Sequence, residues 1–428
     1  MKIYTVILLM LAFACSSPST RIVNPNDYQS LLTTSRVEFV STDKTIEFWQ
    51  TRLGINPNDL TATLQLASLH ASRFKSFGTI DDLHLSDSLF HVALAQTPFG
   101  KASIYQSLAA NAITQHQFKQ ANDYLELALE SGEDKATTHL MLADVRMELG
   151  DIGGAKNILK DIKNKNAFAF LIRQAKIDDK EGHLDSAIMR MEQGLERIGT
   201  SNTSLYCWTK SNLGDMYGHA GRIGDAYQSY LDVLHADPTY VYALKGIAWI
   251  ALSHDRNCKE AKRILHTIKS QKNAPELNLM LAEIAELEQD VTTKRNLEQQ
   301  FITEVGHSGF GVMYNRHIAL LEAEVSPELA VEIAKEEVRN RPTIESYDLL
   351  AWSLYKSGNV KDALEIARTK IEGKTSEPEV MYHLGIMYSQ VNRKKSVGYL
   401  QQANESAFEL GPLASAHVDS LLDSINTF

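Results

Sequence analysis

A leucine or isoleucine followed directly by a small residue recurs along most of the chain. These small residues are spaced about 35 residues apart on average, and a second small residue usually follows each after twelve. Two antiparallel helices can cross closely only where small side chains let the backbones approach, while large apolar neighbours fill the space between pairs. The pattern therefore predicts a series of antiparallel helix pairs. The clearest copies are Leu66-Ala67, Leu108-Ala109, Leu142-Ala143, Leu213-Gly214, Ile247-Ala248, Leu281-Ala282, Leu350-Ala351 and Leu384-Gly385.

The fifth repeat carries the fullest form of the pattern. After its small site come further packing, turn and stop residues, which are Tyr217, Gly221, Ala226, Tyr230 and Pro238. These positions resemble the motif of the tetratricopeptide repeat. The resemblance implies an all-α fold, a right-handed superhelical solenoid of antiparallel helix pairs.

The repeat pattern also sets the expected domain limits. About ten repeats are expected over residues 41–405, with degenerate copies at 41–59 and 286–313. The first repeat carries roughly seven extra residues around Phe74 to Ile80. The glycine-containing stretch Glu304–Gly311 is expected to interrupt the helices as a connector, with a hinge or a binding loop as alternatives. Residues 406–428 are expected to form a C-terminal capping helix, because the last helix of a solenoid needs a polar outer face.

The first residues show a different pattern. Lys2 precedes an apolar run from Ile3 to Phe13, which matches the h-region of an export signal and is too short to span a bilayer. The run ends in small residues before Cys15 and resembles the lipobox of bacterial lipoproteins, although Ala12 stands where most lipoboxes carry leucine. The resemblance implies a signal peptide at 1–14, acylation of Cys15 with palmitate-type chains, and a tether with an N-terminal segment at 15–40.

This signal leads to an expectation about location. By the same resemblance, Ser16 after the cysteine permits sorting to the outer membrane, and no acidic cluster follows that would favour surface display. We therefore expect a lipid-anchored protein of the bacterial cell envelope, in the outer membrane and facing the periplasm. A secreted or surface-exposed protein is the alternative.

Charge and cysteine content narrow the expected partners. The formal net charge is −10, so we expect no nucleic-acid partner, because phosphate binding needs a basic face. Three cysteines are too few for a disulfide scaffold, and none lies in a CxxC pair. Cys207 and Cys258 fall at different positions of their repeats, so we expect free thiols rather than a disulfide between them.

Signatures of catalysis are absent from the sequence. It contains no Walker A, GxGxxG, HExxH, EF-hand or GxSxG pattern. Its histidines are scattered, with no pair at i, i+4 beside a carboxylate. We therefore expect no enzyme activity, no metal site and no cofactor.

The candidate binding residues follow from the repeat resemblance. In that family the first helices of successive repeats line a concave groove that takes peptides or protein segments. Carried onto this sequence, the groove positions select aromatic and basic residues, which often dominate binding energy. They are Arg173, Lys176, Trp208, Tyr242, Lys245, Trp249, Trp352, Tyr355 and Tyr382. The alternative is that the rings only pack between helices.

These observations predict a non-catalytic, membrane-anchored adaptor that binds another envelope protein or peptide in its groove. The alternative is a glycan-binding surface lipoprotein on the same scaffold. Such proteins insert long loops to build a sugar platform, and the only departures of that kind are the extra residues of the first repeat and the stretch around Gly306.

Overall fold

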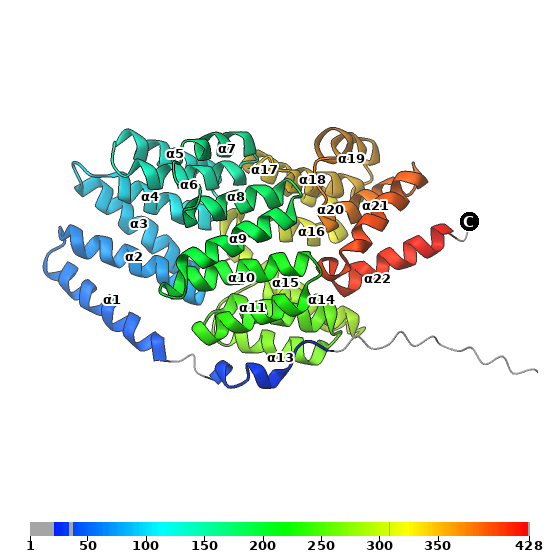
Figure 1. The fold of residues 1–428 in the computed structure, drawn as a ribbon, viewed down its shortest axis with the longest axis horizontal. Coiled ribbons are helices and arrows are strands. Elements are labelled where there is room, and N and C mark those ends of the chain that lie inside the picture. Colours follow the sequence, from blue (N-terminus) through cyan, green and yellow to red (C-terminus); the bar gives the residue numbers. More distant parts are fainter. Residues whose placement is uncertain (1–20, 34–36, 308, 427–428) are drawn as a thin grey trace, which may run out of the picture.

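The computed structural model describes residues 21–33, 37–307 and 309–426. Over these ranges the chain forms helices and connecting turns, without a β-strand (Figure 1). This confirms the predicted all-α solenoid of antiparallel helix pairs. The predicted signal peptide and Cys15 lie outside the described residues.

Twenty of the described helices form ten consecutive antiparallel pairs, numbered one to ten below. The first helices are α2 (Leu60–Phe77), α4 (Ala102–Thr114), α6 (Lys135–Glu148), α8 (Phe168–Lys180), α10 (Thr203–His219), α12 (Val241–Trp249), α14 (Leu277–Leu287), α16 (Asn315–Val325), α18 (Ile344–Lys356) and α20 (Pro378–Tyr388). The second helices are α3 (Ile80–Gln96), α5 (Phe118–Glu130), α7 (Ile152–Lys160), α9 (Leu184–Ile198), α11 (Ile223–Ala236), α13 (Cys258–Lys269), α15 (Val291–His307), α17 (Pro327–Asn340), α19 (Val360–Ile366) and α21 (Arg393–Glu405).

Shorter elements complete the described chain. One helix precedes the pairs, α1 (Val37–Ile55), and one follows them, α22 (Ala407–Asn426). A π-helical turn over Ile250–His254 continues α12, and another over Ala367–Ile371 continues α19. Short 3-10 turns lie at Pro25–Asp27, Leu31–Thr33 and Gly311–Tyr314.

The helices of a pair cross at the small residues that recur in the sequence. Ala143 and Ala155 of pair three are fully buried. In pair five, a Cβ atom added to Gly214 would lie 2.9 Å from the Tyr230 ring, so a larger residue would push the two helices apart. The repeat pattern therefore marks real points of close approach.

The predicted interruption at Glu304–Gly311 is wrong for its first residues. Helix α15 continues to His307, so Glu304 and Gly306 are helical. Phe301 and Val305 of the same helix are buried against α3, in a cluster that includes Leu83. Burial of this apolar face outweighs the cost of about 1 kcal/mol that a glycine adds to a helix interior.

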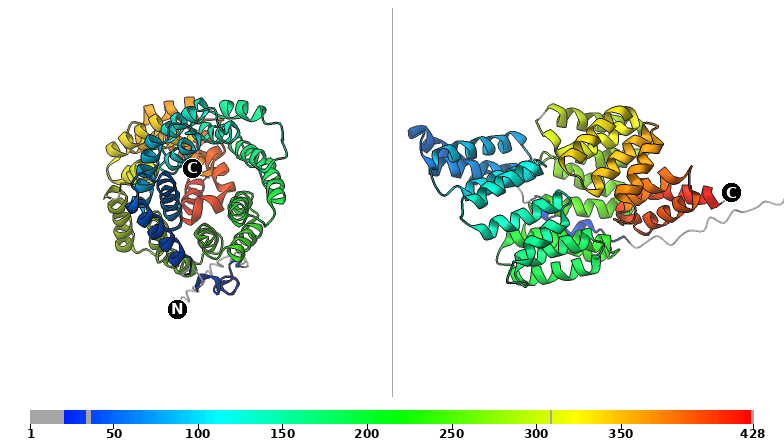
Figure 2. Two further views of the ribbon diagram at one scale, coloured as in Figure 1. Left: turned by 90° about the vertical axis from the view of Figure 1, so that its left-hand side faces the viewer. Right: turned by 90° about the horizontal axis from the view of Figure 1, so that it is seen from above.

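The solenoid winds so that its later pairs return to its earlier ones, and Figure 2 shows the helices arranged around a ring. Between pairs one and six, the Asn273 amide donates a hydrogen bond of 2.8 Å to the Phe77 carbonyl. Further along, the Asn340 side chain donates to the His116 carbonyl at 2.8 Å. The first pair thus lies against the sixth and seventh, and the second lies against the eighth.

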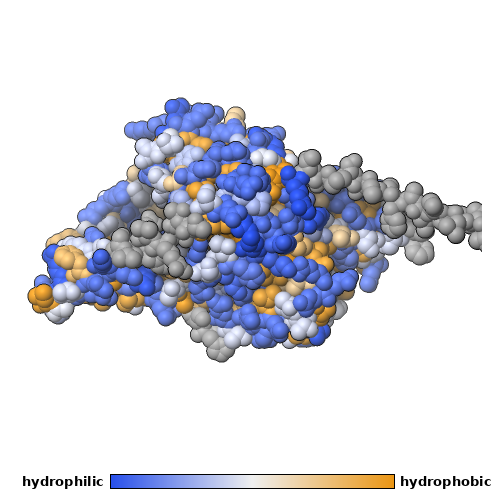
Figure 3. Space-filling model, turned by 90° about the horizontal axis from the view of Figure 1, so that it is seen from below, coloured by the Kyte–Doolittle hydropathy of each residue, from blue (hydrophilic) through white to orange (hydrophobic). Residues whose placement is uncertain are grey.

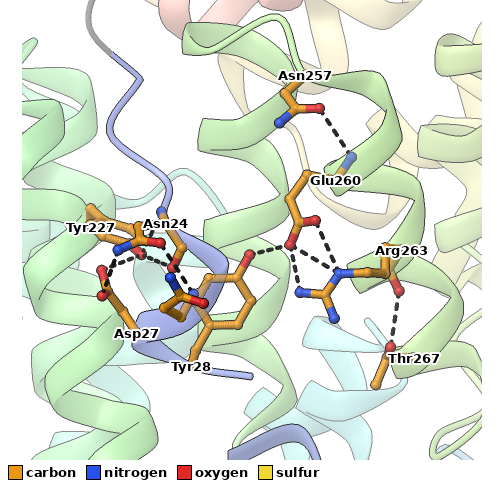
Figure 4. A network of polar contacts seen from close by, with 9 residues as sticks. Asn24, Asp27, Tyr28, Tyr227, Asn257, Glu260, Arg263 and Thr267 are labelled. Carbon is orange, nitrogen blue, oxygen red and sulfur yellow. Dashed lines mark hydrogen bonds and ion pairs between the residues drawn. The ribbon is translucent and has the colours of Figure 1, made fainter. Parts of the chain in front are cut away.

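An N-terminal strap, residues 21–33, lies across the second helices of pairs five and six (Figures 1 and 4). The backbone amides of Ile22 and Val23 donate to the Asp255 carboxylate at 3.0 and 2.9 Å. The Tyr28 side chain is fully buried, and its hydroxyl donates to Glu260. The strap is therefore an integral part of the fold.

Two further side chains complete the strap contact. Arg263 holds the Glu260 carboxylate in an ion pair of 2.6 Å, so the acceptor of the Tyr28 hydroxyl is fixed (Figure 4). The Tyr227 hydroxyl donates to the Asp27 carboxylate at 3.1 Å. Charge-assisted hydrogen bonds of this kind are stronger than neutral ones, so they hold the strap in one register.

Large apolar side chains are exposed at several places along the described chain, and Val325 at the end of α16 is 80% exposed. Phe48 and Ile55 of α1 and Phe99 after α3 are 58%, 82% and 87% exposed. On the face shown in Figure 3, hydrophilic residues predominate, with apolar ones among them. Within the described ranges, no helix combines the length and the apolar character needed to cross a bilayer.

Candidate ligand-binding groove

A cavity of about 900 Å³ lies between the first helices of pairs four, five and six and the end of α2. One wall comes from α8, α10 and the start of α12, and it includes Phe168, Ile172, Lys176, Ser204, Trp208 and Tyr242. The opposite wall comes from pair one and from the turn after α13, and it includes Lys75, Ser76, Phe77, Gln271 and Lys272. The cavity therefore exists only because pair one returns to pair six.

Four of the nine predicted binding residues line this cavity, namely Arg173, Lys176, Trp208 and Tyr242. The Lys176 ammonium lies 5.7 Å from the centroid of the Trp208 ring, a favourable cation–π distance. The half-buried ring presents an aromatic surface next to a positive charge. This combination suits a ligand with both apolar and acidic groups.

Arg173 has a structural role in the cavity wall. Its guanidinium forms an ion pair of 2.6 Å with Asp144 and donates to the carbonyls of Leu140 and Ala169 at 3.0 and 2.8 Å. These bonds engage the guanidinium of Arg173 and the carboxylate of Asp144. Arg173 therefore shapes the wall rather than offering a free charge.

The remaining charges give the cavity a positive character. The other acid, Asp237, accepts from the backbone amide and hydroxyl of Thr239 at 2.9 and 2.6 Å and so stabilises its own turn. In the described part of the chain, no salt bridge involves Lys75, Lys176 or Lys272. Burial lowers the pKa of Lys272, whose ammonium donates to the Lys75 carbonyl at 2.6 Å. An acidic protein thus concentrates unpaired lysines at one cavity.

Tyr242 lies at the rim and is 50% exposed. Its hydroxyl donates to Asp215 at 2.8 Å, and Tyr230 donates to the same carboxylate at 2.6 Å. Burial raises the pKa of Asp215, while the two hydroxyl bonds oppose that shift. The carboxylate therefore fixes the Tyr242 ring at the rim.

The predicted residues of the sixth repeat, Lys245 and Trp249, do not line the cavity. Lys245 forms an ion pair of 3.5 Å with Glu276. Trp249 lies against Gly411 at the start of the C-terminal helix, where a Cβ added to that glycine would be 2.8 Å from the indole. This part of the groove is covered by the chain itself.

The predicted residues of repeats nine and ten form a separate aromatic cluster. Trp352 is only 7% exposed and stacks on His383 with a centroid distance of 4.2 Å. Tyr355 and Tyr382 lie beside the same indole, at 5.7 and 6.5 Å. The structure therefore places Trp352 in the core, because its neighbours from two helices cover both sides of the ring.

The opposite wall of the cavity contains residues that the sequence reasoning missed. Lys75, Phe77 and Lys272 lie outside the groove positions of any repeat. A signal for the first two was present, since the extra residues of the first repeat lengthen α2 to 18 residues, against 13 in α4. The longer helix reaches the turn after α13.

The two cysteines of the described ranges do not line the cavity. Cys207 and Cys258 are free thiols, as predicted, and burial raises the pKa of Cys207 to about 11. A thiol with so high a pKa is a poor nucleophile. Within those residues no group of three or more His, Cys, Asp or Glu side chains is placed to bind a metal ion.

Comparisons with known proteins give only distant similarity. No family model and no curated protein matches the chain. Among solved structures, PilW, described as a type IV pilus biogenesis factor, is 17% identical, covers 49% of this chain and 96% of its own, with a TM-score of 0.38. A tetratricopeptide repeat protein from Parabacteroides merdae is 14% identical, covering 61% and 99%, with a TM-score of 0.35. At these values no residue role or partner is carried over to this chain.

One expectation from the sequence, the exclusion of nucleic acid, is corrected by these comparisons. A human IFIT1 dimer with PPP-AAAA is 14% identical, covers 72% of this chain and 71% of its own, and has a TM-score of 0.46. A monomeric IFIT1 mutant with Gppp-AAAA covers 76% of this chain and 75% of its own. The formal net charge of −10 does not by itself exclude nucleic acid, because phosphate binding depends on local rather than total charge.

Proposed function

We propose that this chain is a non-catalytic scaffold that binds an extended acidic segment of another protein in the cavity between pairs one and four to six. The observation that carries the proposal is the set of unpaired lysines, Lys75, Lys176 and Lys272, around an aromatic surface. A volume of about 900 Å³ is near the upper end of ordinary ligand pockets and accommodates several side chains.

An acidic peptide satisfies both features of the cavity. Its carboxylates meet the lysines of the two walls, and an apolar or aromatic side chain packs on Trp208. Part of the attraction comes from partly exposed charges, so binding weakens as salt rises. The hydroxyls of Ser204 and Thr239 add hydrogen-bonding groups for a peptide backbone.

A labelled ten-residue peptide that alternates glutamate with phenylalanine or leucine tests the proposal by fluorescence anisotropy. We expect Lys176→Glu to weaken its binding at least about tenfold, because a reversed charge would face the ligand's carboxylates. Lys361→Glu is the matched control, since Lys361 is exposed on the second helix of pair nine. A version of the peptide with lysine in place of glutamate should bind weakly.

Equal binding of the acidic and basic peptides, or no effect of Lys176→Glu, would refute the proposal. Two further probes decide between ligand classes. Preference for a single-stranded oligonucleotide over the peptide would replace the proposed ligand by nucleic acid. Binding to a glycan array without peptide binding would favour the glycan-binding alternative.

We further propose that a lipid on Cys15 attaches this scaffold to a membrane of the bacterial envelope. The support is the lipobox-like sequence before Cys15. Five residues lie between Cys15 and Arg21 along the chain, so the two are at most about 22 Å apart. The strap that begins at Arg21 is fixed to α11 and α13, so a lipid would keep these second helices near the membrane. The cavity, built from first helices, would then remain accessible to a partner.

Metabolic labelling with palmitate tests the anchor. We expect label in the wild type, none in Cys15→Ser, and loss of that variant from the membrane fraction, because several acyl chains are needed for stable attachment. Cys258→Ser is the control and should stay labelled and membrane-bound. An unlabelled wild type, or a Cys15→Ser variant that stays with the membrane, would remove the anchor from the proposal.

A further inference from the structure

The C-terminal segment, Phe408–Leu413, lies on the groove face of pairs five to seven, beyond the cavity. It belongs to the start of α22, whose later residues, including Val418, pack with pairs nine and ten. In Figure 2 the C-terminal helices lie inside the outline of the ring. The segment contacts α10, the π turn after α12, and α14, which are consecutive first-helix elements.

Phe408 is the anchor of the segment. Its ring packs over Gly218 of α10, where an added Cβ would lie 2.9 Å from the ring. The carbonyl of Phe408 accepts a hydrogen bond of 2.6 Å from the Ser253 hydroxyl. A glycine-made recess for an aromatic ring and a backbone hydrogen bond beside it are features of a peptide-binding site.

The kink at Gly411 gives the segment its shape. Gly411 has a φ of 80°, Pro412 follows, and the glycine packs against Trp249 and Glu283. Any side chain at residue 411 would clash with the indole, which would be only 2.8 Å away. The Gly-Pro pair therefore fits this face sterically.

Acidic groups surround both ends of the segment. Glu409 lies 3.8 Å from His219, with Asp179 and Glu377 nearby, and burial raises the pKa of Glu409. At the other end, burial and the neighbouring Glu286 raise the pKa of Glu283 to about 7, opposed by Arg256 and by a hydrogen bond from the backbone of Leu413. The crowded carboxylates around Glu409 oppose the docking of the segment, whereas the bond from Leu413 to Glu283 favours it.

We propose that the groove face of pairs five to seven is a second peptide subsite, which the C-terminal segment occupies in cis. A partner whose segment carries an aromatic residue, an acid, an apolar residue, glycine and proline in that order binds there by displacing it. This inference deepens the proposed function, because the subsite extends along the same first helices that line the cavity. The covalently attached segment acts at a high effective concentration, so it lowers the apparent affinity of a partner until it is displaced.

A labelled peptide with the sequence of residues 407–414 and blocked ends tests the subsite on the full chain. We expect weak binding to the wild type and at least about tenfold tighter binding to Phe408→Ala, because the cis ligand is weakened while the recess is intact. Gly411→Ala should have the same effect, since its Cβ would meet Trp249. The same peptide with alanine in place of phenylalanine should not bind either variant.

The recess itself is tested in the Phe408→Ala background. Adding Gly218→Leu should abolish binding, because the leucine fills the space of the ring. Adding Lys176→Glu should leave it unchanged, which separates this subsite from the cavity. If both Phe408→Ala and Gly411→Ala keep wild-type circular dichroism and bind no more tightly than wild type, or if Gly218→Leu has no effect, the inference is wrong. In that case binding of the acidic peptide to the cavity is unaffected.

Discussion

Trp208→Ala is expected to weaken binding of the acidic peptide about thirtyfold. The half-buried indole lines the cavity, and the Lys176 ammonium lies 5.7 Å from its centroid. Removing the ring takes away the packing surface of the ligand's apolar side chain and the support of the lysine. Truncated aromatic anchors commonly cost about 2 kcal/mol, which corresponds to that factor. Isothermal titration calorimetry at low and physiological salt measures the change.

The chain offers a matched control for this substitution. Trp49 of α1 also has a cation over its ring, with the Arg52 guanidinium 5.4 Å from the centroid. Trp49 does not line the cavity, so Trp49→Ala should leave the dissociation constant unchanged. If Trp208→Ala binds as tightly as the wild type while its melting temperature is unchanged, the cavity is not the binding site.

The sequence predicts the wall of the cavity that comes from pairs four to six. Lys176, Trp208 and Tyr242 occupy fixed positions relative to the small residue of each repeat, and that position determines which way a helical side chain points. Local periodicity is sufficient for such residues. The same reasoning predicts the helix pairs, because the buried alanines and glycines mark each crossing.

The other residues depend on contacts between distant pairs, which periodicity does not encode. Lys75 and Lys272 lie almost 200 residues apart and meet only because the superhelix brings pair one to pair six. Trp249 stands at a predicted groove position, but the C-terminal segment covers it. Trp352 is covered by His383, whose ring is held by a buried hydrogen bond of 2.8 Å to Asp348. Each of these outcomes is set by tertiary packing.

The contact between pairs one and six makes Gly78→Ala the most informative structural variant. Gly78 has a φ of 72°, and an added Cβ would lie 1.8 Å from the Asn273 carbonyl oxygen. Since that atom belongs to the backbone, the two turns of the superhelix must separate. The bonds from Asn273 to Phe77 and from Lys272 to Lys75 would be lost. We expect the free energy of unfolding to fall by about 3 kcal/mol, about 1 from backbone strain and about 2 from the two hydrogen bonds.

Separation of the turns also removes one wall of the cavity, so Gly78→Ala should weaken acidic-peptide binding at least about tenfold without changing a residue of the opposite wall. Gly132→Ala is the control, because Gly132 has a φ of 82° and nothing within 4 Å of an added Cβ. In this variant only backbone strain should act, so the free energy of unfolding in urea should fall by about 1 kcal/mol. Binding of the acidic peptide should be normal. Equal losses in both variants would mean that the contact at Gly78 does not support the cavity. A larger loss at Gly78, in stability and in binding together, would show that superhelical closure builds the site.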